Sequence, residues 1–329
     1  MPVIDPNVFA CVFYVYGSLD AAKAGEAAGG TGFFVGVRLE SNSYLQQLYA
    51  VTNRHCLVGS DIVLRVNKAN GQLDYISTKN VDWIVHPDLQ DVAVLPIVLS
   101  PDHDYNFVGS DMFFLTPEIV KSRGLGPGDD VFMVGRFIGQ DGKQGNLPTA
   151  RFGNIARMNS EQIKSDIGID QDSFLVEMRS IPGFSGSPVF VYINPSLARP
   201  PHFITPEDST YNQELHGPWL LGIDWSYLTS FRPVLNSNFD RLQPKQWVEI
   251  NSGMAGVIPA WRIREILELQ ELTMQRKKTD TDISEMDAMH GMAVSDYAQP
   301  DTFTEADFES DLRKVARRVK PSESGEGKK

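Results

Sequence analysis

The sequence predicts an all-β protein with a helical C-terminal part, and two observations support this fold class. From residue 8 to about residue 260, short runs rich in Val, Ile, Phe and Tyr are separated by clusters of Gly, Pro, Asn and Asp, as is typical of strands joined by turns. After Pro259, apolar residues recur at helical spacing instead. Sandwiches and barrels both fit this pattern, so the residues alone leave the sheet architecture open.

Strands are expected where β-branched and aromatic residues cluster, because such side chains fit a pleated, half-buried backbone. The expected strands are residues 8–16, 32–39, 48–52, 62–66, 83–85, 92–98, 131–134, 174–178, 189–193 and 219–223. The pattern weakens between Pro101 and Asp130, where Pro and Gly residues mark loops. We therefore expect a first β unit over residues 1–110 and a second over residues 111–260.

The C-terminal part divides into a helix and a tail. Ile263, Ile266 and Leu267 fall on one face of an amphipathic helix, which is expected over residues 261–278 and packed on the β units. Residues 279–329 are polar with few apolar positions, and this composition predicts a flexible tail.

One stretch of this tail is patterned like a short helix over residues 304–320. Thr304 and Asp307 form a capping box ahead of an apolar stripe, whose residues are Phe308, Leu312, Val315 and Val319. The stripe either docks on the chain's own β units or binds a protein partner, or the segment stays unfolded.

Composition excludes several classes of function. The chain of 329 residues has 42% hydrophobic residues, enough for a substantial core, with a formal charge of −12 and a pI of about 5.0. This acidic balance repels polyanions, so we expect no nucleic-acid partner and no binding to anionic membranes. No uninterrupted apolar run reaches the roughly 18 residues that a membrane-spanning helix needs.

The expected location is the cytoplasm. The N-terminus lacks the basic segment of a signal peptide, and its apolar run over residues 8–16 is short and strand-like. Only two cysteines are present, Cys11 and Cys56. Two cysteines cannot form a disulfide framework, which is ordinary in a reducing compartment, although a single bridge stays open.

A serine between two glycines is the strongest local signal for chemistry. Ser185 lies in the stretch Pro182–Pro188, directly before an apolar strand. A nucleophilic serine needs a tight turn that exposes its Oγ and aims backbone N–H groups at the developing oxyanion, and glycines permit that backbone. A Gly/Ser/Pro turn without chemistry has the same pattern, so the serine needs partners.

Two further residues supply such partners. His55 follows an apolar strand in a polar turn, where its imidazole is able to accept the serine proton. Asp91 heads another apolar strand, and a partly buried carboxylate there holds the Nδ1–H of a histidine in the required tautomer. Asp82, Asp88 and His86 compete for these roles but rank lower because they precede the Asp91 turn.

With these residues in the order His, Asp, Ser, the chain resembles the trypsin-like serine peptidases, specifically their bacterial, disulfide-poor HtrA-like branch. The matching motifs are Thr52-Asn53-Arg54-His55-Cys56, Asp91-Val92-Ala93-Val94-Leu95 and Gly183-Phe184-Ser185-Gly186-Ser187-Pro188. The resemblance spans roughly residues 8–270, and its order argues against an α/β-hydrolase, whose histidine comes last. We expect no PDZ module after the peptidase part.

The resemblance implies two six-stranded antiparallel β-barrels of the chymotrypsin type, with His55 and Asp91 on the first and Ser185 on the second. It implies a serine endopeptidase that cleaves protein or peptide substrates through an acyl-enzyme, without metal or organic cofactor. The backbone N–H groups of Gly183 and Ser185 would form the oxyanion hole. Phe184 stands where secreted members carry an acid that pairs with a new N-terminus, so we expect no activation cleavage.

The substrate-binding residues are likewise implied by the resemblance. Arg179, six residues before the serine, would line the primary specificity pocket and select acidic side chains, or would instead pair with Glu177 or Asp224. The family binds its substrate as an added strand along a segment that here contains Asp224, Trp225 and Tyr227. Trp225 and Tyr227 either wall substrate subsites or fill the core.

Two other functions are compatible with the same residues. A trypsin-like fold can be a catalytically silent binding scaffold, here recruiting a partner through the C-terminal tail. An esterase or transacylase would use the same triad, because acyl-enzyme chemistry does not by itself require an amide substrate.

Overall fold

The computed structural model describes residues 3–26, 28–41, 45–158, 162–164, 168–193, 217–242 and 244–294, with side chains placed as far as residue 285. The chain divides into two compact units, Met1–Asp280 and Thr281–Lys329. All described strands belong to the first unit, and the described part of the second unit is the end of the last helix.

The first β unit is one sheet of eight strands. They are β1 (Val12–Tyr16), β2 (Gly30–Arg38), β3 (Gln46–Thr52), β4 (Asp61–Asn67), β5 (Leu73–Lys79), β6 (Ile84–Val85), β7 (Ala93–Ile97) and β8 (Val108–Gly109). Their hydrogen-bonded order is β5-β4-β1-β2-β3-β7-β6, with β8 beside β2. Neighbours run antiparallel except β2 and β8, which are parallel.

The second β unit is a closed barrel. Its strands are β9 (Asp130–Gly135), β10 (Thr149–Arg157), β13 (Phe174–Glu177), β14 (Pro188–Tyr192), β15 (Trp219–Pro233) and β16 (Trp247–Pro259), joined in the ring β10-β13-β16-β15-β14-β9. All six junctions are antiparallel. A separate two-stranded ribbon consists of β11 (Ile163–Lys164) and β12 (Asp170–Gln171).

The predicted fold class is confirmed, with one correction to the architecture. The second unit is the expected six-stranded antiparallel barrel, but the first is an eight-stranded sheet in which the end strands β5 and β6 do not pair among the described residues. β6 has only two residues and follows the 3-10 turn Asn80–Asp82. So short a strand cannot supply the ladder that would close the sheet onto β5.

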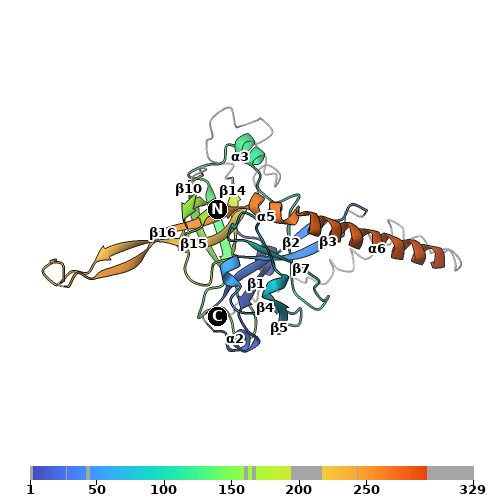
Figure 1. Ribbon diagram of the computed structural model, residues 1–329, viewed down its shortest axis with the longest axis horizontal. Coiled ribbons are helices and arrows are strands. Elements are labelled where there is room, and N and C mark those ends of the chain that lie inside the picture. Colours follow the sequence, from blue (N-terminus) through green and yellow to red (C-terminus); the bar gives the residue numbers. More distant parts are fainter. Residues whose placement is uncertain are drawn as a thin grey trace, which may run out of the picture. The chain divides into compact units, whose positions relative to one another are not determined.

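β15 and β16 are longer than the pattern predicts. The strand expected over residues 219–223 continues to Pro233 and pairs with β16 as far as Trp247. The two strands extend beyond the barrel as a hairpin (Figure 1). Its distal part is exposed, with Phe231 at 63% and Trp247 at 53% exposure, so no alternation of buried and exposed residues marks it in the sequence.

The helices are short except the last. They are α1 (Pro6–Ala10), α2 (Leu19–Ala24), α3 (Pro117–Arg123), α5 (Ala260–Leu267) and α6 (Gln270–Val294). α5 buries Ile263, Ile266 and Leu267, as predicted, and packs on β7 of the first sheet as well as on β15 and β16. It therefore ties the two β units together.

α6 continues past the predicted helix end at residue 278. The polar composition of residues 279–294 suggested a flexible tail, but the Met, Ala and Glu residues of this segment are good helix formers and no proline interrupts it. The helix predicted over residues 304–320 lies outside the described residues. Among the described helices, none combines the length and apolar character required to cross a bilayer.

A buried charged cluster joins the first sheet to the loop after β9. Arg65 of β4, Arg136 and Asp141 are 2%, 0% and 8% exposed. Arg136 Nε lies 2.7 Å from Asp141 Oδ2, and Arg65 Nη2 lies 3.8 Å from the same oxygen. Both guanidiniums also lie over the ring of Tyr16, at 4.4 and 5.5 Å from its centroid. The single carboxylate thus compensates two buried cations.

Candidate active site

His55 and Asp91 contact each other through two hydrogen bonds. His55 lies on the 3-10 turn Arg54–Cys56 that follows β3, and Asp91 lies in the loop before β7. The His55 amide donates to Asp91 Oδ1 at 2.9 Å, and His55 Nδ1 lies 2.5 Å from Asp91 Oδ2. Because an ionised carboxylate only accepts hydrogen bonds, Nδ1 carries the proton and Nε2 of neutral His55 is an acceptor.

Two amide side chains fix the loop that carries Asp91. Asn53 Nδ2 donates to Asp91 O at 2.7 Å, and Asp91 N donates to Gln171 Oε1 at 2.7 Å. Gln171 belongs to β12 in the second half of the chain, so both halves hold the carboxylate in place. Neither residue was predicted from the sequence. Asn53 lies beside His55 along the chain, but nothing local marks Gln171.

The glycines around Ser185 are required by the backbone. Gly183 and Gly186 have φ of +99° and +88°, a region that side chains disfavour. A Cβ on Gly183 would lie 2.7 Å from Ile138 Cγ1 and 2.8 Å from Arg136 O, and one on Gly186 would overlap Thr31 O. The turn predicted around the serine is therefore tightly packed on both sides.

Thr31 of β2 holds the Ser185 loop. Its amide donates to Ser185 O at 2.8 Å, and its Oγ1 donates to Gly183 O at 2.7 Å. Cys56 Sγ lies 3.6 Å from Ser185 O. The loop backbone thus lies directly beside the residue that follows His55. This role of Thr31 was not predicted, because its two flanking glycines are the only signal in the sequence.

Three polar groups of this loop have no partner in the part of the chain that the structure describes. Among the described residues, the Ser185 hydroxyl forms no hydrogen bond, to His55 or to others, and the N–H groups of Gly183 and Ser185 donate to no acceptor. All three are therefore free to contact a ligand. Hydrogen bonds of catalytic groups often tighten only when a substrate binds.

Gly186→Ala should disrupt this loop by more than the strain that a side chain causes at positive φ. The added Cβ meets Thr31 O in addition to the strain of positive φ, so we expect catalytic activity to fall at least about 100-fold through displaced oxyanion donors. Gly128→Ala is the matched control, because Gly128 has φ +100° and open space around it. It should cost only about 1–2 kcal/mol of stability. Equal effects of both variants on activity, measured at a temperature where both are folded, would contradict this.

His55 and Asp224 have displaced pKa values. Burial lowers the pKa of His55, but the charge of Cys56 when ionised and the hydrogen bond with Asp91 outweigh it, so the pKa lies above its usual value. Burial raises the pKa of Asp224 to about 7, although a hydrogen bond from Ser180 and the charge of His55 oppose this. Ser180 Oγ lies 2.7 Å from Asp224 Oδ2, while Asp224 Oδ1 is buried without a partner among the described residues.

The predicted substrate-binding residues differ in exposure. Arg179 is exposed, and no ion pair joins it to Glu177 or Asp224 within the described ranges. Asp224 is fully buried behind the Ser185 loop, where its carbonyl accepts from Gly186 N.

Trp225 is 5% exposed and its Nε1 donates to Ser173 Oγ. Its ring therefore fills the core, the second of the two expectations. Tyr227 is half-buried and stays a candidate for substrate contact.

The competing groups of the first β unit have other partners. His86 is buried, with Nε2 2.8 Å from Glu265 Oε2 of α5 and Nδ1 accepting from Asp88 N. Asp82 Oδ2 accepts from Lys79 N at the start of a 3-10 turn. These contacts give His86 and Asp82 structural roles that account for their positions.

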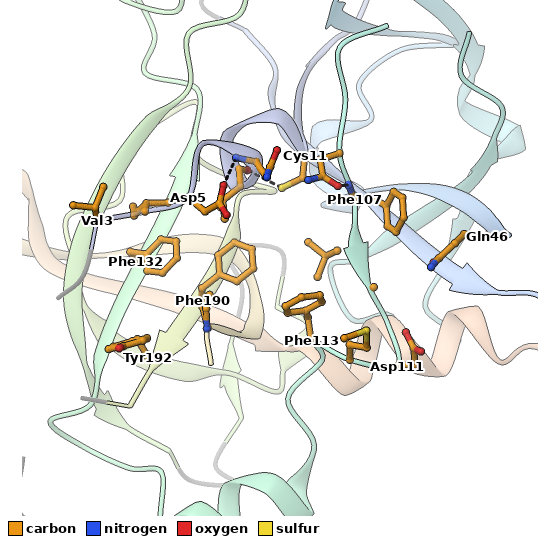
Figure 2. Close-up of a pocket in the computed structure, with 18 residues that line it drawn as sticks. Val3, Asp5, Cys11, Gln46, Phe107, Asp111, Phe113, Phe132, Phe190 and Tyr192 are labelled. Carbon is orange, nitrogen blue, oxygen red and sulfur yellow. Dashed lines mark hydrogen bonds between the residues drawn. The ribbon is translucent and has the colours of Figure 1, made fainter. Parts of the chain in front are cut away.

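A separate cavity of about 470 Å³, within the usual range for small-ligand sites, lies at the far end of β14 from Ser185. Figure 2 shows its aromatic walls, which include Phe107, Phe113, Phe132 and Phe190. Its thiol, Cys11, donates to Val8 O, and burial raises the pKa of Cys11 to about 12. The described lining of the cavity therefore lacks a reactive nucleophile.

Within the described ranges, no three His, Cys, Asp or Glu side chains are placed to hold a metal ion.

Comparison with known proteins finds a family match over part of this chain. Residues 30–192 match the profile of the trypsin-like peptidase domain. Among solved structures, the HtrA-type protease AlgW with tripeptide has 14% identity and a TM-score of 0.42, with 80% of this chain and 62% of that chain covered. Deg5 has 16% identity and a TM-score of 0.39, with coverage of 67% and 81%. No curated protein matches.

The matched segment contains all three residues of the predicted triad. It begins at Gly30, one residue before Thr31, and ends with β14, which follows the Ser185 loop. The chain spans 62% of the length of the HtrA-type protease AlgW. Residues 30–192 of this chain belong to the trypsin-like peptidase domain family.

Proposed function

We propose that this protein is a serine endopeptidase in which Ser185, His55 and Asp91 form the catalytic triad. The observation that carries this proposal is the pair of hydrogen bonds from His55 to Asp91, beside a loop that presents Ser185 between two glycines of positive φ. The resulting tautomer leaves His55 Nε2 as a proton acceptor. No cofactor takes part in the proposed reaction.

In the proposed mechanism, His55 Nε2 removes the hydroxyl proton of Ser185 as Oγ forms a bond to the scissile carbonyl carbon. The carbonyl oxygen becomes an oxyanion that accepts hydrogen bonds from the free N–H groups of Gly183 and Ser185. Asp91 stabilises the imidazolium that forms. The tetrahedral intermediate collapses, the C–N bond breaks, and His55 returns the proton to the leaving amine.

Hydrolysis of the acyl-enzyme repeats these steps with water. His55 takes a proton from the water as its oxygen attacks the acyl carbon, and the proton then goes to Ser185 Oγ as the ester bond breaks. The free acid leaves and the enzyme is restored. Substrate backbone pairing along the Asp224–Tyr227 segment would hold the peptide during both steps.

The proposed reaction requires neutral His55 and therefore depends on pH. Because the pKa of His55 is raised, more of the imidazole is protonated at neutral pH and cannot accept the serine proton. We expect kcat/KM to rise with pH, by about tenfold per unit below this pKa, with an apparent pKa above that of free histidine. Asp91, Cys56 and Asp224 are the charged or titratable groups that act on this histidine. A profile that is flat between pH 5 and about 9 would contradict it.

Peptide and ester libraries test the proposed function. Wild-type protein should cleave internal peptide bonds, while Ser185→Ala, which removes only the attacking oxygen, should not. Ester turnover without peptide cleavage would identify the esterase or transacylase alternative instead. Absence of turnover for both substrate classes, in protein shown to be folded, would favour the binding scaffold.

A further inference from the structure

β15 has a free edge that begins at the Ser185 loop. On this side of the strand, the backbone of Asp224 forms the last two hydrogen bonds, accepting from Gly186 N and donating to Ser187 O. Beyond Asp224 and as far as Pro233, β15 pairs only with β16, and its other edge has no backbone partner in the described part of the chain. The N–H and C=O groups along such an edge are available to an added strand.

The sequence of this edge offers little obstacle to pairing. Proteins usually protect a free edge with charged residues or proline, which prevent another strand from adding. Residues 226–230 contain neither, and Arg232 and Pro233 follow only at the end of the strand. The register of β15 with β16 shifts twice near the barrel, and such bulges increase strand twist and often lie beside active sites. An added strand has to follow this bend.

An exposed aromatic pair lies on one face of the same hairpin. β15 and β16 pair Phe231 with Glu249 and Pro233 with Trp247, so the side chains of Phe231 and Trp247 share a face as diagonal neighbours. Both side chains are exposed. Val248 lies on the opposite face, because successive residues of a strand alternate between its two faces. Phe231 belongs to the strand with the free edge and therefore lies directly beside an added strand.

We propose that this edge binds the substrate as an added antiparallel strand that continues well beyond Tyr227, and that Phe231 contacts an apolar side chain of that strand. The inference rests on the proposed function and specifies its substrate class, an extended and locally unfolded polypeptide. The residues before the scissile bond form the strand, because they stay bound as the acyl-enzyme. Their acyl carbon lies at Ser185, where the edge begins, so the strand runs opposite to β15.

The length of the edge gives the position of the aromatic contact. An extended strand rises about 3.3 Å per residue, so the stretch from Asp224 to Phe231 spans about 20 Å. The substrate residue that meets Phe231 therefore lies roughly six to seven positions before the scissile bond.

Matched peptides of increasing length test where the strand lies. Peptides with about eight residues before the scissile bond should have kcat/KM at least about tenfold above peptides with about three, mainly through KM, because each added backbone hydrogen bond strengthens binding about fivefold. The same extension after the scissile bond should have no effect. Phe231→Ser should remove most of the gain from a distal apolar residue. Val248→Ser, which changes an exposed residue of the opposite face, should keep it.

Binding to the full Ser185→Ala chain tests the edge without turnover. The probe is a fluorescent peptide of alternating Thr and Val with one distal Phe, about ten residues long, in which each residue is N-methylated in turn. In an antiparallel ladder, only every second residue of the added strand bonds to a given edge. N-methylation should therefore weaken binding about fivefold at alternate positions and at most about twofold between them. Absence of binding, or a loss that does not alternate, overturns the proposal.

The combined results separate this inference from the proposed function. An alternating loss in the Ser185→Ala chain supports the edge even if the wild type cleaves nothing. Cleavage without length dependence and without the alternating pattern leaves the peptidase proposal intact and removes the edge. If light scattering shows a wild-type dimer that Phe231→Ser dissociates, the edge pairs with a second copy of the chain and the proposal is overturned.

Discussion

Asp91→Asn should lower kcat for peptide cleavage by about 10,000-fold while leaving the protein folded. The amide side chain can donate to His55 Nδ1, which favours the tautomer whose Nε2 carries the proton and cannot act as a base. The loop position of the side chain is held by Asn53 and Gln171 through the backbone of residue 91. The substitution therefore changes the chemistry of the hydrogen bond between His55 and residue 91 more than the position of the two side chains.

The pH profile of Asp91→Asn supplies a second readout. Loss of the carboxylate removes a group that raises the pKa of His55, so the residual activity should reach its plateau at a lower pH than in the wild type. Asp88→Asn is the control, because Asp88 is an exposed acid of the same loop whose contact to His86 uses its backbone. Similar losses in both variants would show that the loop, and not the Asp91 carboxylate, determines activity.

Asp141→Ala should destabilise the folded chain strongly. It leaves Arg65 and Arg136 as buried cations without a carboxylate, although backbone carbonyls and Asn146 still accept hydrogen bonds from them. Removing one member of a buried ionic cluster costs about 3–5 kcal/mol. Urea unfolding followed by fluorescence measures this as a lower unfolding free energy.

Two comparisons make the Asp141 result specific. Asp240→Ala removes an exposed carboxylate near the tip of the β15–β16 hairpin, so it should change the unfolding free energy by no more than about 0.5 kcal/mol. Asp141→Asn keeps the size and part of the hydrogen bonding of the side chain and should lie between the two. A loss below about 1 kcal/mol for Asp141→Ala would contradict compensation of both arginines by this one carboxylate.

The sequence predicted the all-β class and the elements with strong apolar patterns. β2, β3, β7, β9 and β14 were each expected near their observed positions. β5, β10 and β16 were missed, because their residues alternate weakly between apolar and polar. β10, for example, has the exposed Phe152 next to the half-buried Arg151. Such strands are specified by pairing with neighbours distant in the sequence.

The local parts of the candidate site were also predictable. Glycines at 183 and 186 indicated a special backbone, and His55 and Asp91 are hydrogen-bonded as that interpretation required. Their catalytic roles, like the cytoplasmic location, stay predictions. Thr31 and Gln171 could not be found, because each acts through a backbone contact with a residue far along the chain.

Reaction with a fluorophosphonate, followed by mass spectrometry of the digested protein, tests the central proposal most directly. Only a serine whose proton is removed by a neighbouring base attacks the phosphorus at a useful rate. We predict one phosphonyl group on Ser185 in the wild type and loss of that label in His55→Ala. Folded wild-type protein that remains unlabelled, or that carries the label on another residue, would contradict Ser185 as the nucleophile.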